Sequence, residues 1–202
     1  MLVNFSTCQF LSSARQPEYF IADQGKEVAF VGRSNAGKSS AINCLTQQKQ
    51  LARASKIPGR TQLINFFQLQ NTPAIRLVDL PGYGFARVNR ATKMQWHHLI
   101  DHYLRHRLSL QGLVLIMDSR HPLQPFDLQM LDWSKQTPIR MHVLLNKCDK
   151  LSRHQALQAL AKVQRSTDQA QLSVQLFSAK NKTGLEELGT QISRWLIDQE
   201  TP

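Results

Sequence analysis

The most constraining feature of the sequence is an eight-residue loop with glycine at its first and sixth positions, followed by lysine and serine. The loop reads Gly32-Arg33-Ser34-Asn35-Ala36-Gly37-Lys38-Ser39, and Ser40 follows it. An apolar, β-rich run at residues 28–31 precedes the loop, and a helix is expected from residue 37 to about 47. Between a strand and a helix, such a loop points backbone N–H groups and the helix N-terminus at phosphate oxygens. The spacing therefore predicts a nucleoside triphosphate site rather than a glycine turn with a surface lysine.

Residue types within the loop predict individual roles. Gly37 allows a backbone conformation that a side chain would hinder. Lys38 is expected to reach the β- and γ-phosphates, and the Ser39 hydroxyl is expected to bind Mg²⁺. The loop alone does not choose among kinases, ATPases and GTPases, because all of them use it.

A second motif predicts that the base is guanine. Asn146-Lys147-Cys148-Asp149 follows an apolar run at residues 142–145, at a strand's carboxyl end, where open α/β sheets bind ligands. The Asp149 carboxylate is suited to accept hydrogen bonds from guanine N1–H and N2–H. Adenine would leave it buried and unpaired, at a cost of about 1–3 kcal/mol. Asn146 is expected to tether the phosphate loop and Lys147 to lie over the base; the alternative is a solvated loop with an asparagine cap.

Three further motifs lie at predicted strand ends. In Asp79-Leu80-Pro81-Gly82, Asp79 is expected to hold Mg²⁺ through water, and the Gly82 N–H to meet the γ-phosphate. Thr61, in Pro58-Gly59-Arg60-Thr61, is expected to complete the Mg²⁺ site when the γ-phosphate is present. In Ser178-Ala179-Lys180, the Ala179 N–H is expected to approach guanine O6. The predicted Mg²⁺ ligands are thus Ser39, Thr61 and Asp79, and the predicted catalytic groups are Lys38, Thr61 and Gly82.

Apolar runs that alternate with helical patterns predict an α/β fold: a six-stranded, mostly parallel sheet with helices on both faces. The six runs lie at residues 28–31, 64–67, 75–78, 113–117, 143–145 and 174–177. Further helices are expected at residues 91–107, 125–134 and 152 to about 166, and an amphipathic one at the C-terminus. Residues 1–22 are expected to be an irregular lead-in packed on the domain, and residues 23–202 a single domain.

The ordered motifs resemble those of translation-factor-related GTPases, and the residues within them are similar to those of the EngB family. The resemblance covers about residues 5–198 and rests on residues 32–40, on Pro58-Gly59-Arg60-Thr61-Gln62-Leu63-Ile64-Asn65-Phe66-Phe67 and on Asp79-Leu80-Pro81-Gly82-Tyr83-Gly84. Two departures are Ala41, where a larger apolar residue is expected, and Phe85, where tyrosine is common. The resemblance implies a Ras-like P-loop GTPase domain and a bacterial cytosolic GTPase. It also implies a role in assembly of the large ribosomal subunit, with a link to cell division and septation.

The charge of the chain predicts a polyanionic partner. The formal net charge is +11, and a domain this basic usually contacts nucleic acid; the alternative is a solvated surface rich in cations. Together with the resemblance, this predicts ribosomal RNA of the large subunit or its precursor as a partner, besides GTP and GDP. Candidate contacts lie in the first switch region and around the second helix: Lys49, Arg53, Lys56, Arg60, Arg87, Arg90, Lys93, Arg105 and Arg107.

Membrane insertion and a disulfide scaffold are both disfavoured. No apolar run approaches the ~18 residues that span a bilayer, and the first residues lack the basic region of a signal peptide. Three widely spaced cysteines, Cys8, Cys44 and Cys148, fit a reducing compartment. A cytoplasmic protein is therefore expected, and nothing in the sequence demands more than a monomer.

Tyr83 follows Gly82, at the position where Ras-like proteins carry the glutamine that orients the attacking water. A phenol does not accept from water and donate to the γ-phosphate at once, so intrinsic hydrolysis is expected at or below ~10⁻⁴ s⁻¹. Asn35 resembles the potassium-binding residue of related GTPases, and K⁺ there would neutralise phosphate charge; the alternative is that Asn35 caps the loop. Two other functions stay open: a regulatory module at the division site that holds GTP without significant hydrolysis, and a metabolic kinase, which the guanine motif disfavours.

Overall fold

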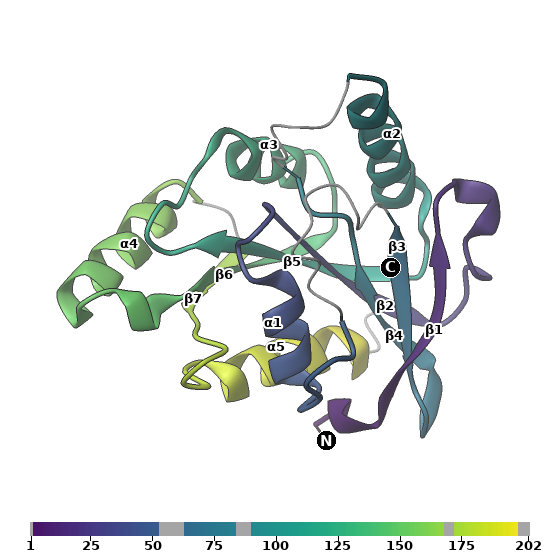
Figure 1. The fold of residues 1–202 in the computed structure, drawn as a ribbon, viewed down its shortest axis with the longest axis horizontal. Coiled ribbons are helices and arrows are strands. Elements are labelled where there is room, and N and C mark those ends of the chain that lie inside the picture. The colour runs from purple at the N-terminus through teal and green to yellow at the C-terminus, as the bar shows by residue number, and fades with distance from the viewer. Residues whose placement is uncertain (1, 53–62, 84–89, 168–171, 198–202) are drawn as a thin grey trace.

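The computed structural model describes residues 2–52, 63–83, 90–167 and 172–197, with the backbone alone for residues 90–97. These residues form a mixed sheet between two layers of helices (Figure 1). The strands are β1 (Cys8–Ala14), β2 (Lys26–Gly32), β3 (Ile64–Leu69), β4 (Thr72–Asp79), β5 (Leu110–Asp118), β6 (Arg140–Asn146) and β7 (Leu172–Leu176). The α-helices are α1 (Lys38–Leu45), α2 (Arg90–His106), α3 (Pro125–Ser134), α4 (Arg153–Arg165) and α5 (Leu185–Ile197).

The sheet of the described residues has seven strands in the order β1-β3-β4-β2-β5-β6-β7. β4, β2, β5, β6 and β7 run parallel, and β3 is antiparallel to both β4 and β1. The six predicted strands correspond to β2–β7. The prediction of six is corrected by β1, which lies in the segment expected to be irregular and pairs with β3. A register shift between Phe10 and Ser12 breaks the alternation of side chains in β1, so its sequence shows no strand pattern.

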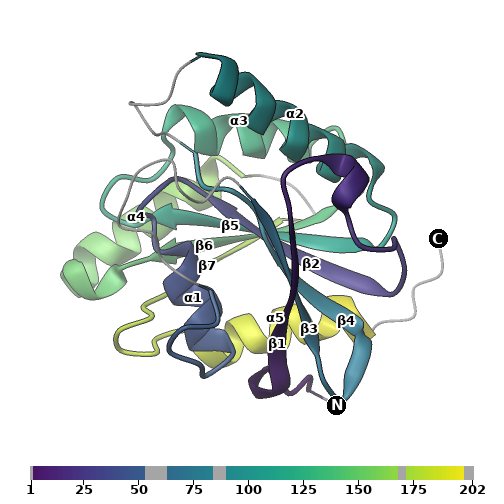
Figure 2. The same cartoon turned by 45° about the vertical axis from the view of Figure 1, so that its right-hand side comes forward.

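Each face of the sheet has its own apolar core. α2, α3 and α4 cover one face, and α1 and α5 cover the other (Figure 2). In β2, Ala29 and Val31 face the first layer, whereas Val28 and Phe30 face the second. β2 is therefore buried on both faces, as its continuous apolar run predicts. None of the helices in the described ranges is long and apolar enough to cross a bilayer.

A buried ion pair joins the start of β2 to the end of α2. The fully buried carboxylate of Glu27 accepts hydrogen bonds from Arg107 Nε at 2.9 Å and Nη2 at 2.7 Å, and from the Tyr103 hydroxyl at 2.8 Å. Arg107 is only 7% exposed. It is therefore a structural residue, and its prediction as part of a surface basic patch is wrong. The reason is a partner 80 residues earlier in the chain, which no local pattern indicates.

Candidate nucleotide site

The carboxyl ends of four parallel strands meet at one edge of the sheet. β2 ends at Gly32, β4 at Asp79, β5 at Asp118 and β6 at Asn146. The β-ladder places Asp118 directly beside Asn146. β2 has β4 on one side and β5 on the other, and open α/β sheets bind ligands where the strand order reverses in this way.

Two residues in the left-handed region bend the loop after β2. Asn35 has a φ of +64° and Gly37 a φ of +99°. A Cβ at Gly37 would also clash with the side-chain amide of Asn146, so both conformation and space require glycine there. The Ser34 N–H donates to the carbonyl of Tyr83 at 2.6 Å. This bond ties the phosphate loop to the segment that follows β4.

The start of α1 combines features that favour an anion. Gly37 is the N-cap and offers no side-chain cap, so the N–H groups of the first turn are left for a ligand. The Lys38 ammonium pairs with the Asp79 carboxylate, and both side chains are buried. Ser39 is half-buried in the same turn, and Ser40 is exposed. The cation suits phosphate, and the hydroxyl and carboxylate oxygens suit Mg²⁺.

The motif at residues 146–149 lies directly against the phosphate loop. Asn146 Nδ2 donates to the carbonyl of Ala36 at 2.8 Å. Lys147 Nζ donates to the carbonyl of Asn35. The structure therefore brings together two of the predicted motifs that lie more than 100 residues apart in the chain.

The residues after β6 and β7 also meet. Ser178 Oγ donates to Asp149 Oδ1 at 2.7 Å and accepts from the Asn181 N–H at 3.2 Å. The bond from Ser178 lowers the pKa of Asp149, so this carboxylate is ionised at neutral pH and able to accept from a pair of N–H donors. Ala179 is half-buried and Lys180 is exposed.

Asp118 belongs to the same cluster, although the sequence motifs do not single it out. Its Oδ2 accepts from Lys147 Nζ at 2.9 Å and from Arg120 Nη2 at 2.7 Å, and its Oδ1 accepts from Arg120 Nε at 2.9 Å. Partial burial acts to raise the pKa of Asp118, but the hydrogen bonds from Arg120 and Lys147 outweigh it and hold the pKa below its usual range. The sequence does contain one indication of its place. Asp118 ends an apolar run as Asn146 does, and the ends of neighbouring parallel strands lie side by side.

Tyr83 is turned toward α3. It is 7% exposed and stacks on Phe126, and its hydroxyl lies 3.9 Å from Met130 Sδ. The predicted residues just before it are buried or half-buried: Leu80, Pro81 and Gly82. The predicted residues of the first switch lie outside the described residues: Pro58, Gly59, Arg60 and Thr61.

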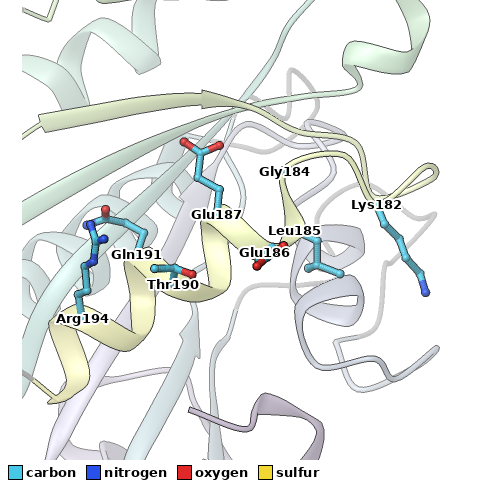
Figure 3. Close-up of a pocket in the computed structure, with 8 residues that line it drawn as sticks. All are labelled: Lys182, Gly184, Leu185, Glu186, Glu187, Thr190, Gln191 and Arg194. Carbon is cyan, nitrogen blue, oxygen red and sulfur yellow. The ribbon is translucent and has the colours of Figure 1, made fainter. Parts of the chain in front are cut away.

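A separate hollow of about 610 Å³ lies along α5 (Figure 3). It is lined by Lys182, Gly184 and one side of α5, and its charges are mixed, with Glu186 and Glu187 opposing Lys182 and Arg194. Because these carboxylates would repel a triphosphate, the strand-end site is the better nucleotide candidate.

Comparison with known proteins identifies the family. Residues 27–147 match the family described as "50S ribosome-binding GTPase". The "Probable GTP-binding protein EngB" of Acinetobacter baumannii is 58% identical over 172 residues, which cover 84% of this chain and 81% of that protein. The protein of the same name from Coxiella burnetii is 47% identical over 193 residues, covering 95% and 93%. The chain belongs to the EngB family.

Solved structures agree with this EngB-family assignment on the fold. A crystal structure of a probable GTP-binding protein engB has a TM-score of 0.69 at 22% identity, covering 84% of this chain and 98% of the other. An Era variant from Aquifex aeolicus, bound to GDP and aluminium fluoride, has a TM-score of 0.66 at 21% identity, covering 89% and 60%. The predicted Ras-like P-loop GTPase fold and the predicted family are thus both confirmed.

Proposed function

We propose that this EngB-family chain binds GTP and GDP with Mg²⁺, hydrolyses GTP slowly and acts as a nucleotide-dependent switch. The observation that carries the proposal is the junction of two loops: Asn146 and Lys147 donate to the carbonyls of Ala36 and Asn35. A base-reading motif held against a phosphate-binding loop fits a single nucleotide that spans both. The EngB relatives are named as probable GTP-binding proteins, which supports the same conclusion.

Residues of the first turn of α1 and the end of β4 would hold the phosphates and the metal. Ser39 and Asp79, with Thr61, are the proposed Mg²⁺ ligands, and the ion would neutralise charge on the phosphates. Lys38, the present partner of Asp79, is expected to turn to the phosphates. Asp79 would then be available to hold Mg²⁺ through water. The Gly82 N–H is proposed to meet the γ-phosphate.

Slow hydrolysis is supported by the position of Tyr83. Its ring is held against α3, and burial raises the pKa of its hydroxyl well above the usual value, so the phenol stays neutral. Such a group does not activate water. The rate without a partner is expected at or below ~10⁻⁴ s⁻¹, and a single-turnover rate near 1 s⁻¹ would contradict this. No hydrolysis even with ribosomal subunits would favour the regulatory module that only holds GTP.

A potassium ion at Asn35 is part of the same proposal. The Asn35 side chain is exposed at the bend of the phosphate loop, and its carbonyl is held by Lys147. A cation beside it would offset charge between the phosphates. Faster single-turnover hydrolysis in K⁺ than in Na⁺ is expected, and equal rates would remove K⁺ from the mechanism.

The proposed partner is the large ribosomal subunit or its precursor. The net charge of +11 favours contact with RNA, and the matching family is described as 50S ribosome-binding. A cytoplasmic monomer suits this role. Involvement in cell division and septation, which the resemblance implies, is proposed as a consequence of ribosome supply.

Co-sedimentation with purified 50S subunits tests the partner. The protein is loaded with GDP or with a non-hydrolysable GTP analogue, at two salt concentrations. More protein is expected in the pellet with the analogue, and less at higher salt. Lys38→Ala is the matched control, since this variant should bind 50S subunits to the same extent with GDP as with the GTP analogue. Binding in neither state would contradict the ribosomal role, whereas a GDP-over-ADP competition tests the nucleotide site separately.

A further inference from the structure

We propose that Asp118 is a positioning residue that holds Lys147 across the phosphate loop and thereby slows release of bound guanine nucleotide. The inference rests on the proposed function, because it concerns the same nucleotide site. It adds a residue from β5 to a site otherwise built by the loops after β2, β4, β6 and β7.

The contacts of Lys147 show why its ammonium needs a second anchor. Its backbone has a φ of +65°, and its N–H donates to Asn146 Oδ1 at 2.8 Å. The side chain then runs back to donate to the carbonyl of Asn35 and, at 2.9 Å, to Asp118 Oδ2. The Lys147 side chain remains 28% exposed. The stem is thus fixed at its far end while one side stays open, as a surface for a base requires.

Asp118 is itself held in place by hydrogen bonds from Arg120. Arg120 donates to it three times: from Nε at 2.9 Å, from Nη2 at 2.7 Å and from the backbone N–H at 3.1 Å. With the bond from Lys147, the carboxylate accepts four hydrogen bonds, which occupy its lone pairs. A carboxylate engaged in this way is suited to orient Lys147, and not to bind a metal or accept a proton from water.

This role differs from that of Asp149. The Asp149 carboxylate is bonded to Ser178 and is proposed to read the edge of guanine. Within the described residues, the hydrogen bonds of the Asp118 side chain come from Arg120 and Lys147 rather than from Asp149 or Ser178, so Asp118 is proposed to act through Lys147. Loss of Asp118 should therefore speed nucleotide release while leaving the preference for guanine over adenine unchanged.

Release rates of a fluorescent GDP analogue, measured by stopped flow, test the proposal. Asp118→Ala should release the nucleotide about tenfold faster, the effect of one charge-assisted hydrogen bond. In a Lys147→Ala background, Asp118→Ala should add no further increase, because the residue on which Asp118 acts is gone. Asp118→Asn keeps an acceptor oxygen without the charge and should show a smaller increase.

Asp132→Ala is the matched control, since it removes an exposed carboxylate paired with Lys135 at 2.8 Å on α3. It should release GDP at the wild-type rate. Wild-type release from Asp118→Ala, or the same acceleration in the Lys147→Ala background, would overturn the proposal. Thermal unfolding of the nucleotide-free variants separates a folding defect from a site effect. Absence of GDP binding by the wild type would instead refute the proposed function together with this inference.

Discussion

Gly37 combines a left-handed φ of +99° with a space in which a Cβ would clash with the Asn146 amide. Gly37→Ala should therefore strain the loop and break the contact between Asn146 and Ala36. Strain and the lost bond together predict a GDP affinity lower by about 100-fold. Gly189→Ala is the matched control, because in α5 the nearest atom to its Cβ, on Leu45, lies 3.9 Å away. That change should leave GDP affinity unaltered and stabilise the fold by about 0.5–1 kcal/mol. GDP titration measures the affinities and urea unfolding measures the stabilities. Equal GDP affinities of Gly37→Ala and Gly189→Ala would contradict the prediction.

Asp127 makes stability depend on pH. It is 1% exposed, and its Oδ2 accepts from the Gln124 N–H at 2.9 Å. Burial raises its pKa to about 6, despite opposing effects of Gln124 and Arg33. The folded state binds the proton of Asp127 more tightly than the unfolded chain does. The contribution of Asp127 to the free energy of unfolding is therefore fully present below about pH 4. This contribution is lost as the pH rises through about 6.

Asp127→Asn should remove that pH dependence, since its amide oxygen still caps α3 without ionising. The variant is expected to be more stable than the wild type at pH 7, by about 2–3 kcal/mol. Urea unfolding of both proteins between pH 4 and 8 measures the difference. A difference that stays constant from pH 4 to 6 would refute the assignment to Asp127.

At the scale of elements, the contact between the start of β2 and the end of α2 depends on one buried arginine. Arg107→Ala would leave the Glu27 carboxylate buried with Arg76, whose Nη1 lies 3.1 Å away, as its remaining cation. The expected loss of unfolding free energy is about 3–5 kcal/mol. Arg105→Ala is the control: its pair with Asp101 is exposed, and the change should cost under about 1 kcal/mol. Urea denaturation compares them, and similar losses would show that burial of Arg107 has little effect.

Elements with a local pattern were predictable, and elements defined by distant contacts were not. The buried strands show continuous apolar runs, and α4 starts close to residue 152, where a helix was expected, with a capping box formed by Ser152 and Gln155. β1 was missed because its bulged register hides the alternation. In the site, the phosphate-loop and guanine motifs could be predicted because each has a characteristic spacing of residues within a short stretch of sequence. Asp118 has no motif, because its role follows from the register of β5 beside β6, and Arg107 was misassigned for the same kind of reason.

Across the whole molecule, charge is unevenly neutralised. Two exposed cations, Arg105 of α2 and Lys135 just after α3, each pair with a carboxylate, that of Asp101 and that of Asp132. α4 contains no Asp or Glu, and within the described residues no ion pair involves its exposed cations: Arg153, Lys162 and Arg165. α4 lies near the edge of the sheet that is opposite to the edge formed by β1 (Figure 1). Under the proposed ribosomal role, its outer surface is predicted to contact an RNA backbone.

The double reversal Lys162→Glu/Arg165→Glu tests that surface, because both residues lie on the solvent side of α4, three positions apart. Binding to a short double-stranded RNA should weaken about tenfold or more, and the salt slope should flatten by about two. The control Lys135→Glu/Arg194→Glu changes the net charge equally, just after α3 and on α5, and its RNA affinity should stay within about twofold of wild type. Fluorescence anisotropy over a salt series measures all three proteins. Equal weakening by the control would mean that RNA senses only the net charge, and that α4 has no special part in the contact.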